Sequence, residues 1–348
     1  MNLPEHRLSI VVPFYNEEEN IAPLVARVHE ALANYPHPWE LILVDDGSTD
    51  HTLERIVEAQ QHYGGHVRLV ALQRNFKQTA AMQAGIDAAR GDVIVTMDGD
   101  LQNDPADIPR LVTRLLTEDL DLVSGWRKER KDDFLLRTFP SRLANALIGR
   151  ITGVKLHDYG CSLKAYRASV LKNVTLYGEM HRFIPAWMAT VTHPRRIAEE
   201  VVTHHPRRFG QSKYGLSRTF RVILDLLFVY FFMRFRTRPG HFFGGIGIAV
   251  AALGGLILIY LFGVKLFLGE SIGGRPLLLA GFFLVLSGVQ FLTTGVLAEM
   301  LTRVYHESGR RTQYQVRTIT PTDAEAGWHK PAQSEPKTND PAHGVASV

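Results

Sequence analysis

The sequence predicts a mostly parallel α/β domain followed by membrane-spanning helices and a polar tail. Three observations lead to this expectation. Strand-like and helix-like patterns alternate through the first part of the 348 residues, two long uncharged apolar runs follow, and the end of the chain is polar. We therefore expect a soluble domain at residues 1–215, an amphipathic interfacial helix at 216–240, two transmembrane helices within 241–305, and a tail without fixed structure at 306–348.

The first half of the soluble domain begins with a strand at residues 8–12, a short run rich in β-branched side chains. A helix is expected at 21–33, where apolar residues recur at helical spacing. Residues 41–44 are continuously apolar and predict the second strand. The following helix, at 52–63, has Asp50 as its expected N-cap.

The second half continues the alternation with a strand at 67–72, a helix at 78–89, a strand at 93–97, a helix at 108–116 and a strand at 120–124. Short connections between alternating strands and helices predict a mostly parallel sheet that is covered on both faces. Ligands of such sheets bind beyond the carboxyl ends of the strands. Polar residues directly after strands are therefore the candidate functional residues.

The two apolar runs, Phe242–Val264 and Pro276–Ala298, each hold 23 residues without a charge. At about 1.5 Å per residue such a helix is about 34 Å long, enough to cross a bilayer. Buried core helices are the less favoured alternative, because these rarely exceed about 18 uncharged residues. Gly247, Ala251 and Gly255 lie at four-residue spacing, which fits either close helix packing or lipid-facing composition.

The charges around the apolar runs predict the orientation. Arginines precede the first run and follow the second, whereas the short connection is poor in positive charge: Arg234, Arg236, Arg238, Arg303, Arg310 and Arg311 against Lys265, Arg275 and Glu270. The positive-inside rule then places both termini and the soluble domain in the cytoplasm. Met1–Val12 lacks the features of a signal peptide. The segment at 217–235 fits either the headgroup layer or packing on the soluble domain.

Composition and missing motifs exclude several classes of protein. A net charge of +4 is too balanced for a nucleic-acid coat, so no nucleic-acid partner is expected. The single cysteine, Cys161, excludes an internal disulfide. Neither a Walker P-loop nor a G-x-G-x-x-G segment follows a strand, which argues against P-loop NTPases and dinucleotide-dependent dehydrogenases.

Acidic side chains follow three of the predicted strands. Glu17 comes after the first strand, Asp45 and Asp46 after the second, and Asp98 and Asp100 after the fourth. Such carboxylates repel one another unless a cation or hydrogen-bond donors lie between them. Asp98 and Asp100 flank Gly99 and can face one hard cation, with Gln102 as a further oxygen ligand. The pattern predicts a Mg²⁺ or Mn²⁺ site that would neutralise a leaving diphosphate.

These motifs carry a resemblance to a known family. The segments Val11–Glu17, Val44–Asp50 and Met97–Gln102 resemble the family 2 glycosyltransferases of GT-A fold, which implies a Rossmann-like, mostly parallel sheet. Asp158–Arg167 and Arg207–Tyr214, followed by two spans, look like the polyprenyl-phosphate glycosyltransferases. That group includes dolichol-phosphate mannose synthase, bactoprenol glucosyltransferases and the undecaprenyl-phosphate aminoarabinose transferase.

The resemblance implies an inverting transfer of a sugar from a nucleotide sugar, expected to be UDP-linked, to a polyprenyl phosphate such as undecaprenyl phosphate. It implies the bacterial cytoplasmic (inner) membrane as the location and a homo-oligomer, a tetramer in relatives, as the assembly. It implies nucleotide-sugar-binding roles for Pro13, Tyr15, Glu17, Asp45, Asp46, Lys77, Asp98, Arg207 and Lys213. It implies metal ligation by Asp98, Asp100 and Gln102, lipid-phosphate binding by Arg127, Arg137 and Ser141, and catalytic roles for Asp100, Asp158 and Arg127.

Several of these roles have alternatives. Arg137 and Ser141 lie four residues apart on one helical face, and without the family a solvated basic face is favoured. The loop holding Arg207 and Lys213 could equally contact lipid headgroups. A phosphate nucleophile hardly needs a general base, so Asp158 could instead orient the sugar or the acceptor. The register of Arg127 departs slightly from the family, because the sequence reads Ser-Gly-Trp-Arg rather than Gly-Ser-Arg.

Three other functions are less favoured by the sequence. A processive polysaccharide synthase would need more spans and a Q-x-x-R-W motif, which the chain lacks. A membrane-anchored, non-catalytic partner of a glycolipid-modifying complex is disfavoured by the intact Asp98 and Asp100. A channel or transporter component would carry inward polar groups in its spans, for which Gln290 and Glu299 are meagre support.

Overall fold

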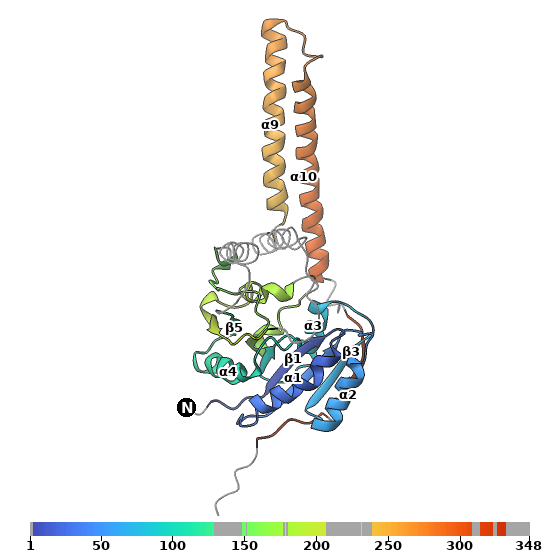
Figure 1. Cartoon of the computed structure of the whole chain (residues 1–348). Helices are drawn as coiled ribbons and strands as arrows, with labels where there is room; N and C mark the ends of the chain where they lie inside the picture. The colour runs from blue at the N-terminus through green and yellow to red at the C-terminus, as the bar shows by residue number, and fades with distance from the viewer. Residues whose placement is uncertain are drawn as a thin grey trace, which may run out of the picture. The chain divides into compact units, whose positions relative to one another are not determined.

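The computed structural model describes residues 3–128, 148–150, 152–176, 178, 180–206, 231, 239–307, 314–322 and 326–331. The chain forms two compact units (Figure 1). The first takes residues 1–138, 156–213 and 313–348, and the second takes 139–155 and 214–312. The first unit therefore contains the sheet together with the C-terminal segment, and the second contains the two long helices.

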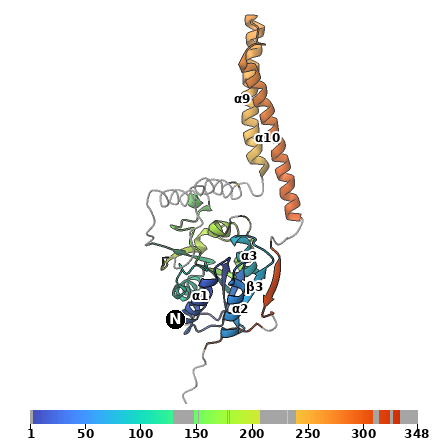
Figure 2. The ribbon, with the colours of Figure 1, turned by 45° about the vertical axis from the view of Figure 1, so that its right-hand side comes forward.

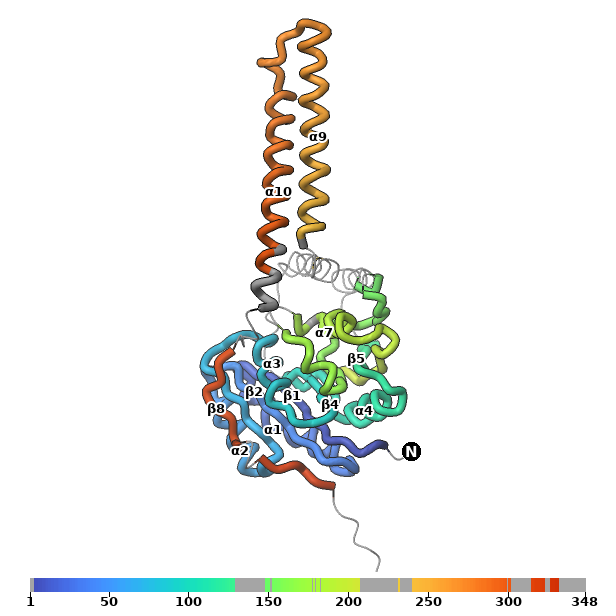
Figure 3. The backbone as a smooth tube through the Cα atoms, turned by 180° about the vertical axis from the view of Figure 1, so that it is seen from behind, coloured from blue at the N-terminus to red at the C-terminus, as the bar shows by residue number. Residues whose placement is uncertain are grey.

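The first unit is built on one eight-stranded sheet in the order β7-β5-β6-β4-β1-β2-β3-β8. The strands are β1 Leu8–Phe14, β2 Trp39–Asp45, β3 Val67–Leu72, β4 Val93–Thr96, β5 Leu122–Trp126, β6 Lys164–Arg167, β7 Ile197–Val201 and β8 Val316–Thr320. The central strands β4, β1, β2 and β3 are parallel, as is the β5–β7 pair, whereas β6 and β8 run antiparallel to their neighbours. Figure 3 shows the labelled strands side by side from β8 to β5. The prediction of a mostly parallel α/β sheet is confirmed.

The principal helices of the first unit are α1 Glu18–Ala31, α2 Thr52–Tyr63, α3 Gln78–Ala88 and α4 Ile108–Thr117. Shorter helical segments are α6 Ala168–Leu171, α7 Ile184–Met188, η1 Pro105–Asp107, η3 Met180–Phe183 and η4 Pro194–Arg196. The predicted bounds of α2 and β3 agree with the structure. β5 ends two residues later than predicted, because Gly125 and Trp126 still pair with β7.

The core of the sheet explains the continuous apolar runs in the sequence. β2, β3 and β4 are buried along their whole length, as expected for parallel strands covered on both faces. Helix α3 approaches β1 very closely at Gly85, where an added Cβ would lie 2.3 Å from Val11 Cγ1. This close packing places the N-terminal end of α3, and thus Gln78, beside the carboxyl ends of the strands.

The C-terminal segment is the main departure from the sequence expectation. β8 pairs antiparallel with β3 and becomes the edge strand of the sheet (Figure 2). The side chain of Gln60, on α2, donates hydrogen bonds to Val67 O at 2.9 Å and to Thr320 O at 2.5 Å. The expected tail without fixed structure is therefore folded at residues 314–322 and 326–331. The β-branched run in β8 supplies the reason, since it fits the exposed edge of β3.

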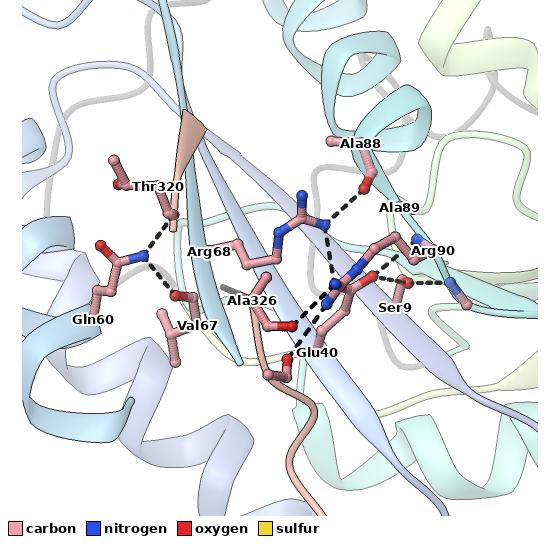
Figure 4. A network of polar contacts seen from close by, with 12 residues as sticks. Ser9, Glu40, Gln60, Val67, Arg68, Ala88, Ala89, Arg90, Thr320 and Ala326 are labelled. Carbon is pink, nitrogen blue, oxygen red and sulfur yellow. Dashed lines mark hydrogen bonds and ion pairs between the residues drawn. The ribbon is translucent and has the colours of Figure 1, made fainter. Parts of the chain in front are cut away.

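A buried network at the amino ends of the strands holds this segment in place (Figure 4). Glu40, on β2, accepts hydrogen bonds from Ser9 Oγ at 2.6 Å, Arg68 Nη1 at 3.1 Å and Arg90 Nη2 at 2.7 Å. Arg90 reaches onward and donates to the carbonyl oxygen of Ala326 at 3.1 Å. Trp328 lies over the guanidinium groups of Arg7 and Arg90, at 5.4 and 4.9 Å from its ring centroid.

An aromatic and imidazole cluster lies at the same end of the sheet. Trp39 and His329 exchange backbone hydrogen bonds, and their rings stack at 4.6 Å between centroids. His29 and His66 contact each other through their Nε2 atoms at 2.8 Å. Burial lowers the pKa of all three imidazoles, and it lowers that of His66 to about 4. The cluster therefore favours neutral imidazoles.

The second unit contains two long helices, α9 Pro239–Leu268 and α10 Pro276–Glu307, which pack side by side (Figures 1 and 2). The segments Gly240–Leu268 and Pro276–Ala298 are long and apolar enough to cross a membrane. Most of their residues are exposed, which disfavours the alternative of buried core helices.

Small residues line the contact between α9 and α10. An added Cβ at Gly247 would lie 2.8 Å from Gly288 O, and one at Gly254 would lie 2.7 Å from Gly281 O. A Cβ at Gly255 would meet no atom within 4 Å in the part of the chain that the structure describes. The close-packing interpretation thus holds for Gly247 and fails for Gly255, because Gly254 takes its place on the packed face. The expected interfacial helix at 216–240 lies outside the described residues, apart from Phe231 and the first residues of α9.

Candidate active site

Three loops meet at the carboxyl ends of β1, β2 and β4. Phe14 and Asp45 end neighbouring strands in register, and Asp46 N donates to Phe14 O at 2.9 Å. Gly99, in the loop after β4, lies directly on the Phe14 ring, since an added Cβ there would be 2.3 Å from Phe14 Cε1. The predicted meeting of the acidic loops at one edge of the sheet is therefore observed.

The loops after β1 and β2 are joined by hydrogen bonds. Asn16 N donates to Ser48 Oγ at 3.0 Å, and Thr49 N donates to Asn16 Oδ1 at 2.8 Å. Asn16 has a φ of 53°, Lys77 of 76° and Leu101 of 59°, all in the left-handed region that non-glycine residues rarely adopt. Each of these residues follows a strand at this edge. Such strained conformations cluster at ligand sites, where the surrounding structure must hold them.

Asp45 and Asp46 are both buried. Ser48 N donates to Asp45 Oδ1 at 3.1 Å, and Phe76 N donates to Asp46 Oδ1 at 2.7 Å. Burial raises the pKa of Asp46 to about 6, against the opposing effect of the backbone hydrogen bonds from Phe76 and Lys77. Burial also raises the pKa of Asp45. Phe76 anchors one oxygen of Asp46, and the chain thereby fixes the direction of an acceptor suited to the N–H edge of a base.

Asp98 and Asp100 lie on either side of Gly99 in the turn after β4. Burial, followed by the charge of Asp100, raises the pKa of Asp98. Gln78 Nε2 donates to Asp98 Oδ1 at 2.8 Å. The charge of Asp100 thus disfavours the charge of Asp98, which is the setting that a divalent cation relieves.

The donor set fits a metal that takes only part of its coordination from protein. Within the described residues no group of three or more His, Cys, Asp or Glu side chains could hold a metal ion. Asp98 and Asp100 would supply two hard oxygen ligands, and Mg²⁺ or Mn²⁺ commonly takes the rest from water and substrate phosphate. The recorded contacts of Gln102 involve its backbone, whose N–H donates to Asp100 Oδ1 at 3.2 Å and whose carbonyl accepts from His205 N at 2.8 Å. Its side chain stays a predicted ligand.

Arg127 and Asp158 form a bidentate ion pair beyond the end of β5. Arg127 Nε donates to Asp158 Oδ2 at 2.7 Å, and Arg127 Nη2 donates to Asp158 Oδ1 at 3.0 Å. Both side chains are about six-sevenths buried, at 14% and 13% exposure. The hydrogen bond and charge of Asp158 raise the pKa of Arg127 against the desolvation that would lower it. The structure therefore brings together two residues that the sequence placed at the site separately.

Lys164 is a buried cation within the Asp158–Arg167 segment, and the sequence predicted no role for it. It is 2% exposed on β6, and its Nζ donates to Cys161 O. Burial lowers the pKa of Lys164, whereas the charges of Asp158 and Asp98 raise it. Gln78 was likewise missed. Its position, as the first residue of a helix that follows a strand, was the available signal, whereas the contribution of β6 depends on an antiparallel pairing with β4.

Residues 9–175 match the family model for "Glycosyl transferase family 2". The chain is 61% identical over 322 residues to the "Dodecaprenyl-phosphate galacturonate synthase" of Rhizobium johnstonii, covering 92% of this chain and 94% of that protein. It is 36% identical over 320 residues to the "Undecaprenyl-phosphate 4-deoxy-4-formamido-L-arabinose transferase" of Yersinia pestis, covering 92% and 95%. The chain belongs to glycosyltransferase family 2.

The family assignment confirms the resemblance read from the sequence, and the protein is a glycosyltransferase. A glucosyl-3-phosphoglycerate synthase from Mycobacterium tuberculosis, solved with uridine diphosphate, shares the fold. Its TM-score is 0.50 at 22% sequence identity, over 65% of this chain and 80% of that one. The GT-A fold expected from the sequence is thereby confirmed.

The remaining predicted site residues of this glycosyltransferase fall into two groups. Pro13 and Tyr15 are half-buried at the end of β1, and the Glu17 side chain accepts a hydrogen bond from Asn20 in the first turn of α1. Lys77 precedes α3 and is held by the Asn75 side chain, which accepts from Lys77 N at 3.2 Å. The other group lies outside the described residues: Arg137, Ser141, Arg207 and Lys213. Their predicted contacts with the lipid phosphate and the donor diphosphate stay predictions.

Cys161 and the pair His204 and His205 make contacts that support the fold. Cys161 is fully buried, and burial raises the pKa of its thiol, which suits an inert small side chain rather than a nucleophile. His205 Nε2 lies 2.9 Å from Asp104 Oδ2. His204 forms an isolated antiparallel bridge with Asn103. These contacts link the loop after β4 to the end of β7.

Proposed function

We propose that this glycosyltransferase moves a uronic acid from a nucleoside diphosphate sugar to a polyprenyl phosphate at the cytoplasmic face of a bacterial inner membrane. One observation carries this proposal: the 61% identity over nearly the whole of a protein named as a dodecaprenyl-phosphate galacturonate synthase. The relative that transfers a formamido-arabinose to undecaprenyl phosphate supports the acceptor class more than the sugar. A UDP-linked galacturonate is the first donor to test, with a C55 or C60 prenyl phosphate as acceptor.

The site residues have complementary roles in this reaction. Asp46 accepts a hydrogen bond from the base, and Pro13, Tyr15, Glu17, Asp45 and Lys77 line the nucleotide. Asp98 and Asp100 hold Mg²⁺ or Mn²⁺, which when bound neutralises the charge of the leaving diphosphate. Arg127 binds a phosphate, as do Arg137 and Ser141 in the lipid acceptor site. Arg207 and Lys213 clamp the donor diphosphate.

The transfer itself inverts the anomeric carbon. A phosphate oxygen of the lipid forms the new bond to that carbon, and the bond to the nucleoside diphosphate breaks with its electron pair staying on the diphosphate oxygen. The nucleophile is already an anion near neutral pH, so the chain need not remove a proton from it. Its main tasks are positioning and charge stabilisation.

The exposed apolar helices α9 and α10 support a membrane location for the enzyme. We propose that they span the inner membrane with both termini cytoplasmic, because the flanking arginines favour that orientation. A homo-oligomer, a tetramer by resemblance, is part of the same proposal. Cysteine labelling from each side of the membrane and light scattering of the purified protein test these two points.

The function is tested with purified full-length protein in lipid nanodiscs. Dodecaprenyl and undecaprenyl phosphate are offered with UDP-galacturonate, UDP-glucuronate, UDP-glucose or the UDP-linked formamido-arabinose, with EDTA, Mg²⁺ or Mn²⁺. Mass spectrometry is expected to find a glycosylated prenyl phosphate with UDP-galacturonate and a metal, and none with EDTA.

Product from another sugar alone would overturn the uronate assignment and keep the reaction class. Product formation at full rate in EDTA would overturn the metal assignment. The absence of any lipid product with all four donors, from protein shown to be folded by its unfolding transition, would contradict the proposed function.

A further inference from the structure

The carboxylate of Asp158 accepts hydrogen bonds from two neighbouring segments. It accepts from Arg127 Nε at 2.7 Å, Arg127 Nη2 at 3.0 Å and Arg127 N at 3.4 Å, and from Gly160 N at 3.1 Å. An added Cβ at Gly160 would lie 3.5 Å from Arg127 Nη2 and 3.6 Å from Asp158 Oδ1, so the loop packs directly against the pair. Both oxygens of Asp158 are thus engaged in holding one guanidinium and its loop.

The geometry of the pair leaves a defined part of Arg127 for another ligand. A guanidinium has a side edge, formed by Nε and one terminal nitrogen, and an end edge formed by both terminal nitrogens. Asp158 takes the side edge. Within the described residues no acceptor is recorded for Arg127 Nη1. The end edge can therefore bind a second oxyanion in the bidentate manner that suits a phosphate.

We propose that Asp158 is a positioning residue that orients Arg127 toward the reacting phosphate, and that it is not the general base of the reaction. This inference rests on the proposed function, because it requires a phosphate as the ligand of Arg127. The pair works as a unit: Asp158 fixes the plane of the guanidinium, and Arg127 presents its end edge to the phosphate. Charge pairing also makes burial of Arg127 tolerable before any substrate binds.

The chemistry of the nucleophile agrees with this division of roles. A phosphate monoester attacks with an oxygen that carries no proton, so a base has nothing to remove. An aspartate whose two oxygens already accept hydrogen bonds from Arg127 and Gly160 is also poorly arranged to take a proton. The contacts of the Asp158 carboxylate instead hold Arg127 in a fixed orientation.

A double-mutant cycle of Asp158→Asn, Arg127→Ala and the combined variant tests the proposal, with kcat and the acceptor KM measured separately. Arg127→Ala is expected to lower kcat/KM for the prenyl phosphate on the order of 100-fold, the effect of losing charge-assisted hydrogen bonds. Asp158→Asn, which keeps the size of the side chain, is expected to lower it by about 10-fold, mainly through the acceptor KM. The double variant is expected to lie within about threefold of Arg127→Ala, because Asp158 acts through Arg127.

A matched control is present at the opposite end of β5. Asp121, 4% exposed, forms ion pairs with Arg196 and Arg167, at 2.8 Å between Arg196 Nε and Asp121 Oδ2. Asp121→Asn removes a buried carboxylate of the same kind from an arginine pair remote from the acidic loops. It is expected to lower the unfolding temperature and to leave kcat and both KM values of the folded enzyme unchanged.

The outcomes separate this inference from the proposed function. If the wild type makes lipid product, a loss in Asp158→Asn confined to kcat at saturating acceptor, with a double variant in which the two losses multiply, would overturn the positioning role and support a base. If the wild type makes no lipid product, the proposed function fails first. If Asp158→Asn unfolds, the Asp158→Glu variant carries the same test of the acceptor KM.

Discussion

The central parallel strands β4, β1, β2 and β3 differ between their two ends in how buried charges are compensated. At the amino ends, Glu40 is fully buried, but Arg68, Arg90 and Ser9 surround it and satisfy both its oxygens. At the carboxyl ends, Asp46 and Asp98 have pKa values raised by burial and by neighbouring carboxylates. At the amino ends the buried charges are therefore paired within the protein. At the carboxyl ends the protein surroundings disfavour the charge of the buried carboxylates.

The difference indicates what each end does. A buried carboxylate with two arginines locks strands and the C-terminal segment together, and it needs nothing from outside. Carboxylates with raised pKa values cost stability in the free protein and become favourable when a cation or a donor group arrives. The carboxyl ends are thus prepared for ligands in a way that the amino ends are not. Four substitutions and a change of pH can break or sharpen this contrast.

The largest effect is expected at the carboxyl ends. Asp100→Asn removes one of the two charges proposed to hold the metal, so kcat should fall on the order of 1,000-fold. The unfolding temperature should stay equal or rise, because the substitution relieves repulsion with Asp98. Turnover of the prenyl phosphate and thermal unfolding of the same preparation measure both. A large drop in unfolding temperature would show that Asp100 is a structural residue and would remove the contrast.

The reverse pattern is expected for Glu40→Gln at the amino ends. This change leaves the fully buried Arg68 without its counter-charge, which should cost about 3 kcal/mol of stability. Because 1 kcal/mol corresponds to roughly 2–4 °C for a chain of this size, unfolding should move down by about 6–12 °C. Below the transition, the kcat and KM of the folded enzyme should match the wild type. An unchanged unfolding temperature would contradict the structural role of the network.

Acidification should lower the stability of the folded state through the imidazole cluster at the amino ends of the strands. The pKa of His66 is lowered to about 4 by burial, whereas an unfolded histidine titrates near 6.5. The unfolded state then binds more protons below that value, so stability is full above about pH 6.5 and is lost as the pH falls towards 4. At pH 5 the loss from His66 should be about 2 kcal/mol.

The carboxyl ends should respond to acid with the opposite sign. Asp46 has a raised pKa of about 6, so the folded state takes up its proton first, and acidification from pH 7 to 5 should favour folding there.

Comparing the wild type with His66→Gln isolates the imidazole contribution to the pH dependence of stability. The variant should lose less stability between pH 7 and 5, and equal losses in the two proteins would rule out His66 as the source.

The smallest effect is expected in the C-terminal segment. Trp328→Ala removes the ring that lies over Arg7 and Arg90, a contact worth about 1 kcal/mol, so unfolding should fall by about 2–4 °C. Activity at 25 °C should be unchanged, because the contact lies at the amino ends of the strands. Limited proteolysis after β8 should become faster. A loss of activity without a loss of stability would link this segment to catalysis instead.

Local patterns were sufficient to predict the elements that carry an apolar run or a helical period of their own. The β-branched runs and helical spacings gave β1 to β5 and α1 to α4, and the acidic residues after β2 and β4 did gather at one edge. β6 and β8 were missed because neither is a continuous apolar run: β6 has only four residues, two of them charged, and β8 lies in a polar tail. The Arg127–Asp158 pair was missed for a different reason, since two residues 31 positions apart meet only after β5 and the following loop are in place.

The tail illustrates why polar composition alone misled. Its ordered part is held by backbone pairing and by side chains of other elements, such as Gln60 and Arg90, rather than by its own apolar content. A segment of this kind reads as disordered in isolation. Its order depends on pairing with β3, a strand from a distant part of the chain.

The position of β8 also dictates an order of events during synthesis. The ribosome makes β3 early, then the two apolar helices, and only afterwards the strand that covers the outer edge of β3. Until then that edge presents unpaired backbone groups, a template for association with other nascent chains. A chain interrupted after its second apolar helix would keep every acidic loop and yet carry an open sheet. The sheet can therefore be completed by β8 only after both apolar helices have been synthesised.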